Sequence, residues 1–151
     1  MLHTTYARLA IVRSDRASRV AVSPDGASLY YAIERPVVSG GSDLEIRVAR
    51  PENAASRVLA RIPARRAAPW GGFQPVVSPD GQWLSLALLD GVTSNLWALS
   101  TSTGRLRQLT DFGERPTFIT RRVSWSSDGR AIHASVGEGD SDVVLFEGLH
   151  P

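Results

Sequence analysis

The chain has 151 residues, 42% of them hydrophobic and 21% charged, a composition that suits one ordinary domain with a core and argues against wholesale disorder. No apolar run approaches the roughly 18 residues of a membrane span. The absence of cysteine excludes disulfides and thiolate metal sites and leaves the compartment, periplasmic or cytoplasmic, open.

All 17 basic residues are arginine, and the formal net charge is +2. Forked guanidinium groups suit phosphate or carboxylate recognition. The arginines are scattered along the chain, however, and nucleic-acid binding needs a clustered basic face. We therefore expect no nucleic-acid partner for this segment.

Residues 1–12 contain an apolar run through Tyr6, Leu9 and Ile11. The segment lacks the basic start and the apolar stretch of a signal peptide. Its run begins 23 residues before Asp25, an interval that returns further along the chain. It predicts the last strand of a preceding unit.

The first complete unit opens with Ser23-Pro24-Asp25-Gly26. Proline presets φ, aspartate bonds the local backbone, and Gly26 closes a hairpin in the left-handed conformation. Alternating apolar residues over 29–33 then predict a strand with one face more buried than the other. Further strands are expected over 44–48 and 57–62.

The same order of turn and strands returns twice. Residues 78–81 repeat the turn identically, and residues 126–129 keep three of its four residues, with Ser127 in place of proline. The expected strands are 74–77, 84–88, 96–99, 105–109, 122–125, 132–136 and 143–146. This makes about four short strands per unit and no convincing amphipathic helix.

Three landmarks recur in register along the sequence. The turn aspartates Asp25, Asp80 and Asp128 are 55 and 48 residues apart. Each unit also carries a serine, an aspartate or asparagine and an aliphatic residue, at 42–44, 94–96 and 141–143. The segments starting at Arg57 and Arg105 each lie 23 residues before the next turn aspartate. Agreement among three landmarks identifies an internal repeat.

This pattern resembles the TolB-type, WD-like β-propeller repeat. Residues 104–111 match its Gly-x-x-x-x-Leu-Thr element, and residues 123–129 match its opening, with the likeness running from about Val20 onward. The resemblance implies an all-β fold of about three four-stranded antiparallel blades. The approximate blades are 13–62, 63–110 and 111–151, and residues 1–12 are a remnant strand of a preceding blade.

Propellers close with several blades, so three predict a partial ring that belongs to a larger propeller of roughly six to eight blades. We expect the chain to be the C-terminal part of a longer bacterial protein, which supplies the other blades. The alternative is a homo-oligomer that completes the ring.

The sequence contains little that suggests catalysis. No Gly-x-Ser-x-Gly elbow is present, and His133 alternates with apolar residues on an expected strand. The string over 138–142 has oxygen ligands beside glycine but lacks the later glutamate of a calcium loop, so we interpret it as a hairpin. A phosphate loop would need a lysine. No cofactor, metal or catalytic residue is therefore expected.

Two arginine groups fall in matching linkers between the expected blades, and one of these linkers also carries two aromatic residues. They predict a partner-binding rim that comprises Arg65, Arg66, Trp70, Phe73, Arg115, Arg121 and Arg122. The alternative is a set of ordinary solvated loops. Trp83, Trp97 and Trp125 lie in expected strands and should pack between blades.

The resemblance implies a non-catalytic scaffold for protein or peptide interaction, without a membrane span. Relatives of this repeat occur in envelope complexes and behind signalling domains, so a sensor role is implied. The alternative function is a propeller fragment that gates substrate access in a prolyl-oligopeptidase-like serine peptidase. Both expectations come from fold-level likeness.

Overall fold

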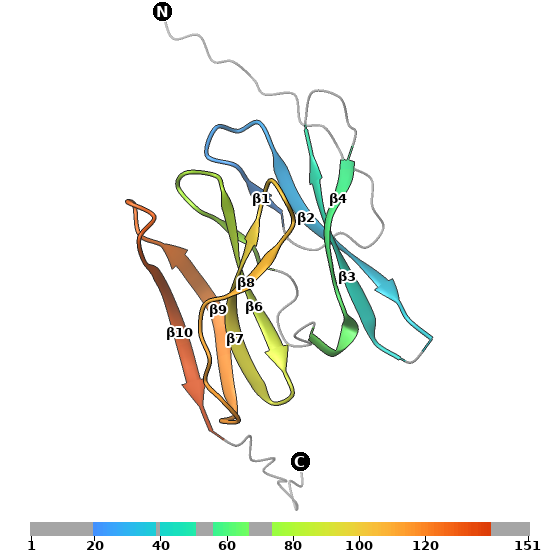
Figure 1. Cartoon of the computed structure of the whole chain (residues 1–151), viewed down its shortest axis with the longest axis vertical. Coiled ribbons are helices and arrows are strands. Elements are labelled where there is room, and N and C mark those ends of the chain that lie inside the picture. Colours follow the sequence, from blue (N-terminus) through green and yellow to red (C-terminus); the bar gives the residue numbers. More distant parts are fainter. Residues whose placement is uncertain (1–19, 39, 51–55, 67–73, 140–151) are drawn as a thin grey trace, which may run out of the picture.

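The computed structural model describes residues 20–38, 40–50, 56–66 and 74–139 (Figure 1). The fold is all-β, with ten strands and one short 3-10 helix in this part of the chain. The elements are β1 Ala21–Val22, β2 Leu29–Pro36, β3 Ser42–Ala49, β4 Ser56–Ile62, η1 Ala64–Arg66, β5 Val76–Val77, β6 Trp83–Asp90, β7 Thr93–Ser100, β8 Leu106–Gln108, β9 Thr117–Trp125 and β10 Ile132–Glu138. No helix in these ranges is both long enough and apolar enough to cross a membrane.

The strands form two sheets of antiparallel neighbours. The first sheet has the order β1-β2-β3-β4. In the second, β5, β6, β7 and β8 follow the same order, and the β9–β10 hairpin joins through one parallel pair, Thr93 with Thr117. The short strands β1, β5 and β9 contact one another in sequence order. The expected strand order of the repeat is thus present in both four-stranded meanders.

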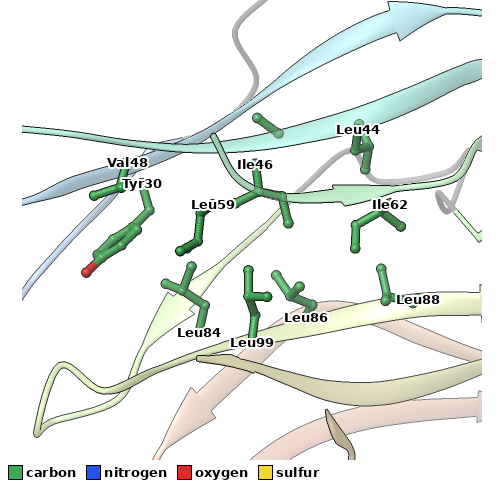
Figure 2. Packing of buried hydrophobic residues seen from close by; sticks show 11 residues of the cluster. Tyr30, Leu44, Ile46, Val48, Leu59, Ile62, Leu84, Leu86, Leu88 and Leu99 are labelled. Carbon is green, nitrogen blue, oxygen red and sulfur yellow. The ribbon is translucent and has the colours of Figure 1, made fainter. Parts of the chain in front are cut away.

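The core lies between the faces of the two meanders. Leu44, Ile46 and Ile62 of the first sheet point toward Leu84 and Leu99 of the second (Figure 2). Ile46, Ile62, Leu84 and Leu99 are at most 1% exposed. Burial of an aliphatic side chain of this size contributes about 1.5–3 kcal/mol. This apolar contact is the main force that holds the two meanders together.

The second meander is covered on both faces. On the face away from the first sheet, Ser85 is fully buried and its Oγ donates to the carbonyl oxygen of Val76 at 3.3 Å. The indole Nε1 of Trp125, in β9, donates to the same oxygen at 3.0 Å. A buried hydroxyl needs such a partner, and the shared carbonyl joins the β9–β10 hairpin to the second meander.

Most of the expected strands are confirmed, with one boundary wrong. The strand expected to begin at residue 122 begins instead at Thr117. Thr117 is fully buried, and its hydroxyl bonds both the amide and the carbonyl of Ser94, each at 3.2 Å. These contacts extend the strand through a polar stretch. The expected strands in residues 1–12 and 143–146 lie outside the described residues.

Candidate interaction surface

The three Ser-x-Asp-Gly turns share one set of hydrogen bonds. In the second copy, the amide of Gly81 donates to the Ser78 carbonyl at 2.8 Å, and the Ser78 hydroxyl donates to Asp80 Oδ1. Asp80 Oδ1 also accepts from the Gln82 amide at 3.0 Å, and Ser78 Oγ accepts from the Trp83 amide at 3.0 Å. The turns over 23–28 and 126–131 repeat all four bonds.

The glycine of each turn has the predicted left-handed backbone, with φ of 72° at Gly26, 72° at Gly81 and 71° at Gly129. The third copy keeps this geometry although Ser127 replaces proline. The serine and aspartate side chains therefore hold the turn without the proline ring. This confirms the prediction that aspartate shapes the backbone here.

The turn carboxylates are held in their charged form. The serine hydroxyl, followed by a backbone amide, lowers the pKa of Asp25, Asp80 and Asp128 below the usual aspartate value. Hydrogen bonds to a carboxylate favour its ionised state. A general acid needs the opposite shift, so these aspartates are poor candidates for proton transfer.

The turns also contact one another. A Cβ placed on Gly81 would lie 3.6 Å from Cδ of Pro24, and one placed on Gly129 would lie 3.7 Å from Cδ of Pro79. Each proline therefore packs beside the glycine of the next turn. The three turns form a row at one end of the molecule (Figure 1). Sequence reasoning assigned proline only a local role and missed this contact.

The opposite end of the sheets carries the linkers that leave β4 and β8. Thr93, at the start of β7, contacts the carbonyl oxygens of Gly113 and Arg115 at 3.0 and 2.8 Å. Asn95 Oδ1 accepts from the Phe112 amide and the Thr110 hydroxyl, each at 3.1 Å. These buried partners fix the linker over 109–116 against the second meander.

The serine, aspartate or asparagine landmark has the same purpose in the first meander. Asp43 Oδ1 accepts from the amide of Ala64 at 2.8 Å, at the point where η1 begins. Asp43 and Asn95 hold equivalent positions in the repeat, and each bonds the backbone that follows the fourth strand. The landmark thus anchors the start of each linker, which the spacing alone did not reveal.

The residues expected to form a rim occupy two linkers and a strand. Arg65 and Arg66 lie in η1, and Arg115 lies in the linker before β9. Arg65 and Arg115 are exposed. Both linkers lie away from the row of turns (Figure 1). Two exposed guanidinium groups therefore share this end of the molecule.

Arg66 makes an internal contact. Its Cζ lies 4.2 Å from the centroid of the Trp97 ring, a distance suited to a cation–π interaction. The Nε of Arg66 and the Nε1 of Trp97 are buried and have no hydrogen-bond partner in the described part of the chain. The stacked pair attaches η1 to β7, which agrees with the prediction that Trp97 packs inside the array.

The other members of the rim are less defined. Arg115 pairs with Glu138 at 3.3 Å, and both side chains are more than half exposed, so the pair contributes little to stability. Arg121 and Arg122 belong to β9, and Trp70 and Phe73 lie outside the described residues. The rim as a whole stays a prediction.

A buried charge cluster covers the other face of the first sheet, and sequence reasoning did not find it. Glu45 is 5% exposed and bonds the guanidinium of Arg47, with Arg35 and Arg61 within 3.6 Å of its carboxylate. Arg47 also donates to Ser56 Oγ at 3.1 Å. The bond from Arg47 is the chief cause that lowers the pKa of Glu45. The carboxylate is thus fixed as an internal counter-ion.

A groove separates the second meander from the β9–β10 hairpin. It encloses about 420 Å³. The wall from the second meander includes Trp83, Leu96 and Ala98, and the wall from the hairpin includes Trp125 and Ile132. The face is mainly apolar, and it is the most enclosed candidate for a ligand or a packed segment in the described part of the chain.

The remaining candidates for chemistry are weak. His133 is exposed on β10, as expected. Of the acidic string over 138–142, Glu138 pairs with Arg115 and the aspartates lie outside the described residues. No group of three acidic or histidine side chains that could hold a metal ion occurs within the described ranges.

No family model and no curated protein matches this sequence. Two solved structures with a similar fold are both of AtxE2 isopeptidase. A serine-to-alanine variant with Astexin3-dC4 bound has a TM-score of 0.57 and 17% identity over 72% of this chain, and the apo form has 0.55 and 21% over 76%. The chain spans about a fifth of their length, 19% and 20% respectively. At these identities the likeness concerns the fold alone.

Proposed function

We propose that this chain is part of a β-propeller that acts as a non-catalytic scaffold for a protein or peptide partner. The meanders β1–β4 and β5–β8 would be two of its blades, and β9–β10 would begin a third. The repeated strand order, the face-to-face packing and the row of turns support this interpretation. Propeller blades are four-stranded antiparallel sheets packed in this way.

The observation that carries the proposal is the division of labour among the charged residues. The aspartates of the turns and the buried Glu45 are engaged in internal hydrogen bonds that keep them ionised. Arg65 and Arg115 instead expose their side chains from linkers that the Asp43 and Asn95 bonds hold in place. A rigid pair of exposed guanidinium groups suits recognition of carboxylates. We therefore propose an acidic peptide segment as the ligand class.

The test is a titration of the purified chain with a fluorescently labelled glutamate-rich decapeptide. Binding should weaken as salt increases, because exposed charges are screened. The double variant Arg65→Gln/Arg115→Gln should bind about tenfold more weakly, equivalent to about 1.4 kcal/mol. Arg105→Gln is the matched control, since Arg105 is exposed in the turn before β8. Equal weakening by both variants, or no binding to the wild type, would refute an acidic ligand at this rim.

A second candidate function is supported by the similarity to AtxE2 isopeptidase. In this case the blades would gate substrate access to a peptidase domain elsewhere in a longer polypeptide. The longer protein would then react with a fluorophosphonate probe for serine hydrolases, and rim substitutions would change KM more than kcat. A longer protein that does not react with the probe would exclude the gating role.

The ring requires further blades, which we propose come from the same longer chain. A homo-oligomer that completes the ring is the competing source. Light scattering on the purified chain separates the two, because ring completion by copies requires a discrete oligomer. A folded monomer would exclude that route.

A further inference from the structure

The groove beside the β9–β10 hairpin has a counterpart between the two meanders. There, Leu99 and Trp97 of β7 pack against the first sheet, and they pair with Leu84 and Leu86 of β6. Leu99 is completely buried at that position. The counterpart of β6 in the third copy is β10, which ends the strand order of its sheet in the described part of the chain. A strand beside β10 would close the groove in the way that β7 closes the first interface.

The sequence places such a strand directly after β10. Residues 141–143 repeat the landmark that opens β3 at Ser42 and that stands at Ser94 in β7. In β7, the residues that enter the interface are the third and fifth after Ser94. The matching positions after Ser141 are Val144 and Phe146. Both are apolar, as a buried strand face requires.

The sizes of the side chains on the two sides of the groove are complementary. Ala98 lines the groove at the position that Ile46 holds in the first meander. The incoming residue differs in the opposite direction, because Phe146 stands where β7 has Leu99. A smaller wall residue opposite a larger incoming one keeps the total volume of the interface nearly constant.

We infer that residues 141–147 add to β10 as an antiparallel strand and fill the groove with Val144 and Phe146. By analogy with β6 and β7, Phe146 pairs with Ile132 and Val144 pairs with Ala134. The groove is then an internal interface of the chain and not a ligand site. This inference rests on the repeat and the groove, and it is independent of the proposed function.

The chain has no cysteine, so a pair of introduced thiols reports the strand register directly. In the inferred register His133 lies opposite Leu145, with both side chains on the face away from the groove. Cross-strand Cβ atoms lie about 4.5–5.5 Å apart, near enough for a disulfide after small adjustments. The variant His133→Cys/Leu145→Cys should therefore form an intramolecular disulfide under mild oxidation.

The control is His133→Cys/Val144→Cys, which moves one thiol to the opposite face of the strand. It should cross-link at least about tenfold more slowly, since its thiols point apart. Equal rates for the two pairs would overturn the register. A cross-linked dimer in place of the monomer would assign the groove to a second copy and would equally overturn the inference.

A second measurement tests the filling of the groove. Phe146→Ala should lower the unfolding temperature by about 6–15 °C, as expected for loss of a buried aromatic side chain in a domain of this size. Leu145→Ala changes the neighbouring residue on the outer face and should lower it by less than about 3 °C. A Phe146→Ala protein as stable as the wild type would show that the groove is filled by something else.

Discussion

Gly104 is the position where the packing of the two meanders allows no side chain. It lies in the turn between β7 and β8, with φ of 71°. A Cβ at this position would lie 2.0 Å from the carbonyl oxygen of Leu59 in β4, and 3.1 Å from its carbonyl carbon. The obstacle is backbone, so Gly104→Ala can be accommodated only if the turn moves away from the first sheet.

The expected cost has two parts that can be separated. An alanine in the left-handed region costs about 1 kcal/mol or slightly more. Relief of the overlap with Leu59 adds about 1–3 kcal/mol, the usual cost of an overpacked interface. Gly26→Ala is the matched control, because Gly26 has φ of 72° and nothing within 4 Å of its added Cβ. The control should lose only the first part.

Urea unfolding followed by tryptophan fluorescence measures both variants. We expect Gly104→Ala to reduce the free energy of unfolding by about 3 kcal/mol and Gly26→Ala by about 1 kcal/mol, with unchanged m-values. In thermal unfolding this corresponds to about 6–12 °C against about 2–4 °C. Equal losses in the two variants would refute the close approach of the β7–β8 turn to β4.

Three further changes test other contacts of the fold. The lowered pKa of the turn aspartates means that their hydrogen bonds stabilise the protein above about pH 4 and are lost as the pH falls through the folded-state value, so the unfolding temperature should fall below about pH 4, and less steeply in Asp80→Asn. Asn95→Leu leaves the Phe112 amide without its acceptor and should cost about 1–3 kcal/mol in urea unfolding, whereas no loss would mean that the linker is not anchored there. Arg47→Met removes the closest partner of a buried carboxylate and should cost about 3 kcal/mol, against less than about 0.5 kcal/mol for the exposed Arg61→Met, and similar losses would contradict the cluster.

Local patterns in the sequence predicted the strands and turns well, because each depends on residues close together in the chain. The left-handed glycines, the bond from aspartate to the following backbone and the alternation over 84–88 follow from turn chemistry and from period-two burial. The start of β9 was wrong because Thr117 is held by Ser94, a contact across 23 residues that no local pattern encodes.

The candidate surface was harder to predict for the same reason. Arg66 was expected on a binding rim, and its contact with Trp97 depends on how η1 meets β7. The three arginines around Glu45 come from three different strands, which only the register of the sheet brings together. The contact of Pro24 with Gly81 likewise appears only when one meander is stacked on the next.

The most direct test of the proposed scaffold function is an amide NMR titration of the labelled chain with the glutamate-rich decapeptide. The proposal predicts shift changes concentrated at residues 64–66 and 109–117, the two linkers that carry Arg65 and Arg115. The amides of the Ser-x-Asp-Gly turns, and the indole signals of Trp83 and Trp125 in the groove, should stay unchanged. Changes concentrated at the groove, or none at the linkers, would contradict the assignment of the binding surface to the arginine-bearing end.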